Sequence, residues 1–489
     1  MPVSPSFSPA THFYDLSPGT GAPFYDAVEP ADFPALTLRY RNDRAAQSVG
    51  LATLNDSEWL NHFGRFEPLA GAQAGPLALR YHGHQFRHYN RDLGDGRGFL
   101  FAQLYDGNGR LLDIGTKGSG QTPYSRSGDG RLTLKGGVRE VLATEMLAAQ
   151  GVYTSKTLSV IETGEALYRG DEPSPARSCV LCRLSHAHVR FGTFQRLAYE
   201  KDDAGLERLV DYCLTHLLTD NAAPEGKARI ISFFDQVVRR SASLAASWMA
   251  AGFVHGVLNT DNMTVTGESF DYGPWRFLPV ADPGFTAAYF DQTGLYAYGR
   301  QPEAVGWNLA QLGGALARIA PADVLTHSLS RYPDHYEQYA EKAFARRFGL
   351  AEFDPTDGTD ERPVMALLKW MGKTGAHFEQ VFFDWYGAGT PSADQSAAPR
   401  ASDSPQAQLY ARPDFAPIRE VLLHGKPLAA STRAHAYFNR PTPVTLLIDE
   451  VEALWAPIAD NDDWTAFEKK IADIRLMGEA LALEATSGF

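Results

Sequence analysis

Cysteine is scarce in this sequence. Three occur among 489 residues, at Cys179, Cys182 and Cys213, which is too few for a disulfide framework and suits a reducing compartment. Cys179 and Cys182 have the Cys-x-x-Cys spacing of redox and metal pairs, but the sequence holds one such pair alone. The surrounding run, Ser-Cys-Val-Leu-Cys-Arg-Leu, is typical of a buried strand. We therefore expect both thiols to pack in a core.

Positive charge is also in short supply. The chain has 45 Lys and Arg against 58 Asp and Glu, a net charge of -13, and a pI near 5.5. Proteins that bind nucleic acid in general need clustered basic side chains to neutralise phosphates. The composition therefore argues against a nucleic-acid partner, although it is compatible with a local basic pocket.

Long hydrophobic runs are missing as well. The most apolar stretch, residues 243–258, is interrupted by Trp248, Gly252 and His255 and is too short for a membrane-spanning helix. We interpret it as a core helix that leads into a catalytic loop. The first 15 residues show neither the basic start nor the apolar run of a signal peptide. We expect a cytoplasmic protein with no membrane partner.

The overall composition is typical of a folded, globular protein: 44% of the residues are hydrophobic, 21% charged and 12% aromatic. The length exceeds one ordinary domain. Residues 1–78 combine Pro-rich coil with short helical stretches such as 56–63, and we interpret them as an N-terminal packing extension. Two apolar runs, 98–105 and 110–117, flank Asp-Gly-Asn-Gly and predict a β-hairpin.

Helical spacing over 131–150, ending at Gly151, predicts a helix after this hairpin. Further strands are expected near 157–162 and 178–184, and helices near 205–219, 230–252 and 306–319. We assign residues 79–190 to a β-rich part and 191–386 to a helical part. Residues 387–413, rich in Ala, Ser and Pro, predict a flexible linker. Residues 414–489 form a C-terminal extension with helical runs at 444–455 and 464–482.

The segment from His255 to Gly273 is the most informative one. It reads His-Gly-Val-Leu-Asn-Thr-Asp-Asn and then, after an apolar run, Asp-Tyr-Gly. A protein kinase has His-x-Asp-Leu-x-x-x-Asn followed by Asp-Phe-Gly, so Val257 stands where the catalytic aspartate would be. Asn262 and Asp271 are hard oxygen ligands suited to Mg²⁺. Asp261 is a candidate base, although neighbours in an extended segment point opposite ways.

Several other polar residues precede this segment. Gly94 and Gly96, with Arg97, form a turn in which backbone N–H groups could approach a phosphate, and such turns also serve as plain hairpin bends. Lys117 ends a strand where a kinase places its phosphate-binding lysine. Its candidate partner is Glu140, with Glu145 as the alternative.

Two loops add to these candidates. Asp129 and Gly130 lie in a polar loop that either contacts a nucleotide or is a surface turn. Arg183 and Arg190 flank Leu-Ser-His-Ala-His-Val. Their guanidinium groups could bind a polyphosphate bidentately, as lysine cannot, and the alternative is a pair of surface arginines.

Taken together over residues 80–320, these motifs closely resemble the SelO family of pseudokinase adenylyltransferases. The resemblance implies an α+β, protein-kinase-like fold with two lobes, a β-rich small lobe and a helical large lobe, and ATP bound in reverse. AMP would pass from ATP to Ser, Thr or Tyr hydroxyls of proteins, some of them redox-related, and pyrophosphate would leave. Ordinary phosphoryl transfer and a catalytically dead nucleotide-binding scaffold are the alternatives.

The resemblance also implies residue roles. Asp261 matches the proton acceptor, Asn262 and Asp271 match the ligands of Mg²⁺, or of Mn²⁺ in its place, and Glu140 matches the partner of the lysine. The implied nucleotide contacts are Gly94, Gly96, Arg97, Lys117, Asp129, Gly130, Arg183 and Arg190.

Three features depart from the family pattern. Lys135-Gly-Gly137 replaces an Arg-Ser-Ser run, and no cysteine follows Cys213, so the family's C-terminal thiol or selenol is missing. Residues after about Ala388 also diverge. A redox switch built on that thiol is therefore not expected, and the choice of target could differ.

Overall fold

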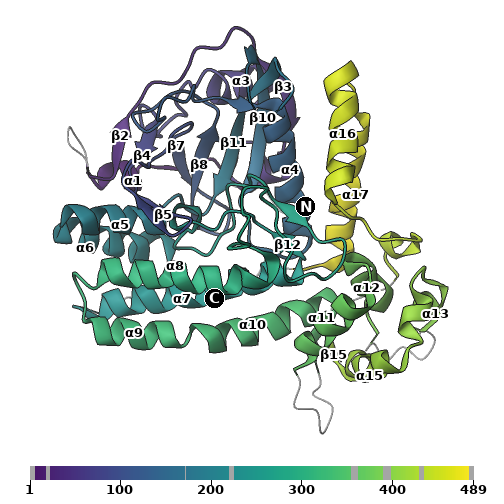
Figure 1. Cartoon of the computed structure of the whole chain (residues 1–489). Helices are drawn as coiled ribbons and strands as arrows, with labels where there is room; N and C mark the ends of the chain where they lie inside the picture. The colour runs from purple at the N-terminus through teal and green to yellow at the C-terminus, as the bar shows by residue number, and fades with distance from the viewer. Residues whose placement is uncertain are drawn as a thin grey trace.

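The computed structural model describes residues 6–17, 23–170, 172–219, 225–353, 362–388, 398–428 and 434–483. Within these ranges the protein is α+β, with a nine-stranded antiparallel sheet. Figure 1 shows the sheet above a layer of long helices. This confirms the α+β class.

The predicted hairpin is the centre of the sheet. β7 (Leu100–Tyr105) and β8 (Leu111–Lys117) pair antiparallel, and the Asp106 carboxylate accepts the N–H groups of Asn108 and Arg110 in the turn. β11 (Ala176–Ser185) pairs with β8, and β10 (Lys156–Leu167) pairs with β11. The short strand β9 (Leu132–Thr133) also pairs with β11.

The predicted helix over 131–150 is α4 (Leu134–Ala149), which packs against β10 and β11. The Thr133 hydroxyl caps it by accepting the N–H of Gly136. Its apolar residues are buried as the spacing required: Val138, Val141, Leu142, Met146 and Leu147. Gly151, just beyond the helix, has φ +80°, a left-handed conformation that favours glycine.

Cys179 and Cys182 lie on β11, as the expectation of strand packing required. Both are buried free thiols, and they belong to core clusters on opposite faces of the sheet, because residues three apart in a strand point opposite ways. The two thiols therefore do not form a pair.

The N-terminal residues are more than a packing extension. The helix predicted at 56–63 is α3 (Asp56–Phe63), and α1 (His12–Asp15) and α2 (Asp43–Ser48) are short. The sequence reading missed four strands that join the same sheet: β1 (Pro9–Ala10), β2 (Tyr25–Ala27), β3 (Thr37–Arg41) and β4 (Leu77–Leu79). Strands this short carry too little alternation to be recognised.

The helical part is built around the 23-residue helix α7, which contains the first half of the apolar stretch and packs against α8, α9 and α10. The helices of this part are α5 (Phe191–Glu200), α6 (Asp203–Tyr212), which continues as a π-helical turn (Cys213–Leu217), α7 (Ala228–Ala250), α8 (Gln301–Leu316), α9 (Ala322–Ser330), α10 (Tyr332–Arg347), α11 (Pro363–Thr374) and α12 (Phe378–Trp385).

Several short elements lie outside the large sheet and the long helices. They are the hairpin of β5 (Gly83–Gln85) and β6 (His88–Asn90), the pair β12 (Phe253–Val254) and β13 (Arg276–Phe277), the pair β14 (Leu350–Glu352) and β15 (Lys426–Pro427), and 3₁₀ turns at Thr260–Asn262 and Tyr298–Arg300.

The prediction of a linker over 387–413 is wrong for its described part. Residues 398–413 contain α13 (Ala398–Asp403) and α14 (Ala407–Tyr410). Tyr410 packs between Trp370, Trp385 and Phe415, and its hydroxyl donates to Asp384 at 2.7 Å. These partners come from other segments, so composition did not reveal them. Residues 389–397 lie outside the described residues.

The C-terminal extension lies beside α4, as the yellow helices of Figure 1 show. Arg475 of α17 (Thr465–Leu481) forms a bidentate ion pair with Glu145 of α4, at 2.8 and 2.9 Å. The other elements here are α15 (Ala416–His424), α16 (Ile448–Asn461) and the 3₁₀ turns Pro413–Phe415 and Ala436–Asn439. Residues 444–447, predicted helical, precede α16. In the described part of the chain, no helix is long and apolar enough to cross a membrane.

Candidate active site

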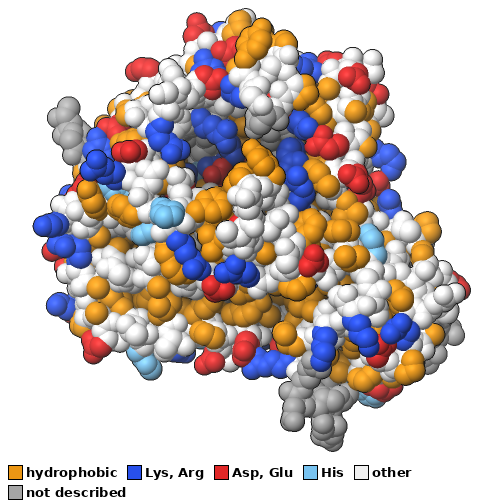
Figure 2. Space-filling model, in the orientation of Figure 1, with side chains coloured by type: hydrophobic (Ala, Val, Ile, Leu, Met, Phe, Trp, Pro, Cys, Tyr) orange, Lys and Arg blue, Asp and Glu red, His pale blue; other side chains and the backbone are white. Residues whose placement is uncertain are grey.

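A cavity of about 770 Å³ opens between the sheet and the 255–273 segment. Figure 2 shows a hollow on this face with Lys and Arg side chains in and around it. Every residue expected at the site lines the cavity except Glu140, which lies behind it and contacts Lys117. The tertiary structure therefore brings together residues from Gly94 to Asp271.

Lys117 connects the two sides of the cavity. Its Nζ atom lies 2.7 Å from Oε2 of Glu140 and 2.8 Å from Oδ1 of Asp271. Glu145, the alternative partner, is taken by Arg475 instead. Burial alone would raise the pKa of Asp271, but Lys117 and the two nearby arginines outweigh it and hold that pKa well below its ordinary value.

Arg183 and Arg190 are buried, each about 5% exposed, and both guanidinium groups lie over the ring of Phe270. This excludes the alternative of two surface arginines. Arg190 donates to Asp95 at 3.0 Å and to the Tyr81 hydroxyl at 3.1 Å. Nη1 of Arg183 and Nε of Arg190 are buried and make no hydrogen bond to the described residues. Two buried cations with unused donors provide a site for an anion.

Asp261 lies in the 3₁₀ turn Thr260–Asn262, not in extended chain. Asp261 and Asn262 therefore both line the cavity instead of pointing opposite ways. Burial raises the pKa of Asp261 to about 6, Arg190 opposes this, and Asp271 adds to it. The carboxyl is thus suited to accept a proton near neutral pH.

The donor atoms here fit a hard divalent cation. Oδ1 of Asp261 and Oδ1 of Asn262 are buried and have no hydrogen-bond partner among the described residues, and Nδ2 of Asn262 donates to Oδ2 of Asp271 at 3.2 Å. Carboxylate and amide oxygens are the ligands that Mg²⁺ prefers. Across the described ranges, no group of three His, Cys, Asp or Glu side chains could hold a metal ion. A metal bound at this place would therefore need the amide oxygen of Asn262 as one of its ligands.

Tyr124 leaves no room for side chains at Gly94 and Gly96. A Cβ atom at Gly94 would lie 2.2 Å from the ring of Tyr124, and one at Gly96 would lie 2.9 Å from the Tyr124 carbonyl oxygen. Gly130 has φ +69°, and its Cβ would lie 2.2 Å from the Gly120 oxygen. These contacts, more than the approach of a phosphate, explain the glycines. Asp129 is exposed at the rim and ion-paired with Arg169 at 2.7 Å.

Sequence reasoning missed several residues of the site. Asp95 holds Arg190, His188 accepts from Arg183 Nε at 3.1 Å, and Phe270 supports both arginines. Tyr81, Tyr124, Arg126 and Asn259 also line the cavity. Asp95 stands within the glycine turn and Phe270 directly before Asp271, but neither type is rare enough at those places to be noticed.

Comparison with known proteins agrees with this geometry. The family model described as protein adenylyltransferase SelO matches residues 11–475. The chain belongs to the SelO family. The protein is therefore a protein nucleotidyltransferase, of the kind that transfers an adenylyl group. The match extends well beyond the motif region at 80–320.

Three relatives, each named protein nucleotidyltransferase YdiU, are similar to this chain over nearly their whole length. The one from Gloeobacter violaceus is 45% identical over 469 residues, 93% of each chain. The one from Synechocystis sp. is 41% identical, covering 93% of this chain and 96% of the relative. The one from Synechococcus elongatus is 40% identical, covering 99% and 96%.

Proposed function

We propose that the cavity binds ATP with Mg²⁺, or with Mn²⁺ in its place, and transfers AMP to Ser, Thr or Tyr hydroxyls of proteins. The observation that carries the proposal is the position of Lys117, Arg183 and Arg190 around the same cavity as Asp261, Asn262 and Asp271. Cations for a polyphosphate and oxygens for a metal are the two requirements of nucleotide transfer.

The distribution of charge supports a reversed nucleotide. Lys117, Arg183 and Arg190 are all buried, whereas the loop 126–129 at the rim is exposed. A triphosphate placed against the buried cations would leave the adenosine toward the rim. The β- and γ-phosphates would then lie deepest, and the α-phosphate nearer Asp261.

In the proposed reaction the hydroxyl oxygen of the acceptor bonds to the α-phosphorus. The bond from that phosphorus to the oxygen bridging to the β-phosphate breaks, and pyrophosphate leaves. Asp261 accepts the hydroxyl proton, while Lys117, Arg183 and Arg190 stabilise the charge that develops on the leaving group. Asn262 and Asp271 would hold the metal, which supplies further positive charge to the phosphates.

We interpret the architecture as kinase-like, with residues 79–190 as the small lobe and 191–386 as the large lobe. In support, Lys117 and Glu140 lie on the sheet and α4, whereas Asp261, Asn262 and Asp271 follow the core helix α7. The strands β1, β2, β3 and β4 extend the sheet of the small lobe, and α16 and α17 pack against α4.

Labelled ATP tests the proposal. The full chain is incubated with dephosphorylated β-casein, Mg²⁺ and ATP labelled at either the α- or the γ-phosphate, and the acceptor is analysed by intact mass. We expect the α-label and the mass of AMP on the acceptor. Transfer of the γ-label alone would indicate phosphoryl transfer, and ATP binding with neither label transferred would indicate a dead scaffold.

A further inference from the structure

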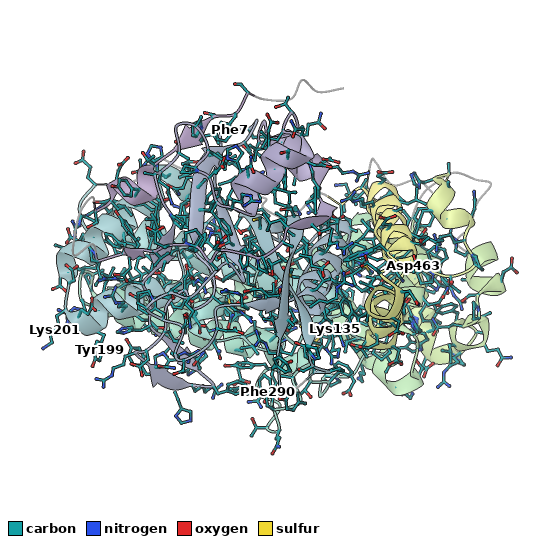
Figure 3. The ribbon with its side chains drawn as sticks, turned by 90° about the horizontal axis from the view of Figure 1, so that it is seen from above. Phe7, Lys135, Tyr199, Lys201, Phe290 and Asp463 are labelled. Atoms are coloured by element: carbon teal, nitrogen blue, oxygen red, sulfur yellow. The ribbon has the colours of Figure 1, made fainter. Side chains whose placement is uncertain are left out.

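Two aromatic side chains stand in solvent beside the active site. Tyr289 is 85% exposed and Phe290 46%, and their ring centroids lie 5.2 Å apart. Phe290 contacts Phe86 of the β5–β6 hairpin, with ring centroids 5.9 Å apart. We call Tyr289, Phe290 and Phe86 the aromatic ledge. Figure 3, seen from above, places Phe290 at the margin that faces the viewer in Figure 2, the face with the hollow.

The segments that carry the aromatic ledge contact the 255–273 segment at two places, Gly256 and Asn259. Ala287 packs so tightly on Gly256 that a Cβ there would lie 3.0 Å from the Ala287 Cβ. On the other side, the Phe86 N–H and the Tyr296 hydroxyl both donate to Oδ1 of Asn259, at 3.1 and 2.7 Å. Asn259 stands two residues before Asp261, so the ledge has a set position relative to the proposed base.

The segment that carries the ledge is itself well anchored. The buried carboxylate of Asp291 accepts the N–H groups of Leu295 and Tyr296, at 2.9 and 2.8 Å. The exposed rings therefore do not result from a loose loop. They contribute little to the core, and aromatic side chains presented together on a surface are typical of sites that bind a protein partner.

Neither Tyr289 nor Phe290 lines the nucleotide cavity, whereas Gln85 and Asn259, next to their supports, do. The aromatic ledge thus lies outside the cavity, adjacent to its Asp261 side. Asp261 is 9% exposed, so a hydroxyl on a flat, folded surface could not reach it. The acceptor must enter as a narrow, extended segment, and the neighbouring part of that segment would pass the ledge.

We propose that the aromatic ledge binds a flexible segment of the acceptor protein, one that carries a bulky apolar side chain close to the modified hydroxyl. This proposal rests on the proposed function and gives its substrate class. The one arginine of the hairpin, Arg87, is already paired with Glu303 at 3.1 Å and lies over Trp307. Apolar contact, more than charge, would therefore select the segment.

Synthetic peptides test the ledge directly. Each peptide has one central Ser in a Gly–Asn background, with a single Leu or Phe placed at successive flanking positions, and the matched peptide keeps Asn there. The variants are Tyr289→Ser and the double variant Tyr289→Ser, Phe290→Ser. Met365→Ser on α11 removes another exposed apolar side chain, 58% exposed, and serves as the control. The readouts are kcat/KM for transfer of the α-label and Kd for ATP.

We expect the unaltered chain to prefer the apolar peptides by about 10-fold. The double variant should lose this preference while Kd for ATP and transfer to the Asn peptide stay unchanged, and Tyr289→Ser should lose part of it. An equal preference in the double variant, or none in the unaltered chain, would overturn the proposal.

Two further outcomes separate this proposal from the proposed function. If the unaltered chain transferred no α-label to any peptide or to β-casein, both would fall. If transfer and preference were unchanged but the double variant changed from dimer to monomer in size-exclusion chromatography, the ledge would be a contact between copies of this chain.

Discussion

The Nζ atom of Lys117 lies 2.8 Å from Oδ1 of Asp271, a residue 154 positions further along the chain. The last residue of β8 thereby contacts the residue that opens Asp-Tyr-Gly. Asp271 has φ +62°, an uncommon conformation for a residue other than glycine. The contact closes the buried end of the cavity and joins the sheet to the 255–273 segment.

Replacing Asp271 should abolish transfer while keeping the fold. In Asp271→Ala, Lys117 keeps its ion pair with Glu140 at 2.7 Å, but the proposed metal loses its carboxylate ligand. We expect transfer of the α-label to fall by about 100-fold or more, with the fold retained in circular dichroism but a lower Tm, because the depressed pKa of Asp271 means that its charged form stabilises the fold. Full activity in this variant would show that the metal binds elsewhere.

Asp261→Asn should separate activity from stability. The amide cannot accept the proton, so we expect kcat to fall by about 10²–10⁴-fold with Kd for ATP little changed. Because burial raises the pKa of this carboxyl to about 6, its charged form destabilises the fold at pH 7. Urea unfolding at pH 7 should therefore show a gain of about 1–3 kcal/mol, and unchanged transfer would exclude Asp261 as the base.

The pH dependence of transfer should follow the same carboxyl. Asp261 must be ionised to act as a base, so kcat should rise about 10-fold per pH unit below pH 6 and level off above it. The stability contribution has the opposite sign: it is present below the ordinary pKa of Asp and is lost as pH rises through 6. Measuring kcat from pH 4.5 to 8 checks this. The residual kcat of the Asp261→Asn variant should no longer fall at acidic pH.

Gly94→Ala should damage the cavity through Tyr124. The new Cβ would lie 2.2 Å from the ring of Tyr124, which must move together with the loop that lines the cavity. We expect a loss of about 1–3 kcal/mol in unfolding free energy and a higher KM for ATP. Gly75→Ala, where a Cβ meets nothing within 4 Å, is the matched control. Tyr124→Ala in the Gly94→Ala background should restore much of the stability.

The contact of the C-terminal extension with α4 should matter for both stability and activity. Arg475→Ala leaves Glu145, a largely buried carboxylate, without its bidentate partner. We expect a loss of about 3 kcal/mol and lower transfer, since α4 carries Glu140. A double-mutant cycle with Glu145→Gln isolates the pair, because the double variant should lose less than the sum of the two single ones.

Much of the fold could be predicted where the pattern was local. The hairpin of β7 and β8 was visible from two apolar runs and an Asx-Gly turn, and α4 from its apolar spacing and its end at Gly151. The short strands before residue 79 were not visible, because two to five residues show no clear alternation. Residues 398–413 were misread because the side chains that order Tyr410 lie in other segments.

The candidate site divides in the same way. The order and spacing of the motifs along the chain were enough to indicate the family and the chemical types of the site residues, because such spacing is a property of the sequence alone. The folded chain was needed to show that Arg183 and Arg190 are buried against Phe270. It was also needed to show that Tyr124 leaves no room for a side chain at Gly94, and that a 3₁₀ turn directs Asp261 and Asn262 into one cavity. Burial, ring contacts and backbone direction depend on segments far apart in sequence, so no local pattern contains them.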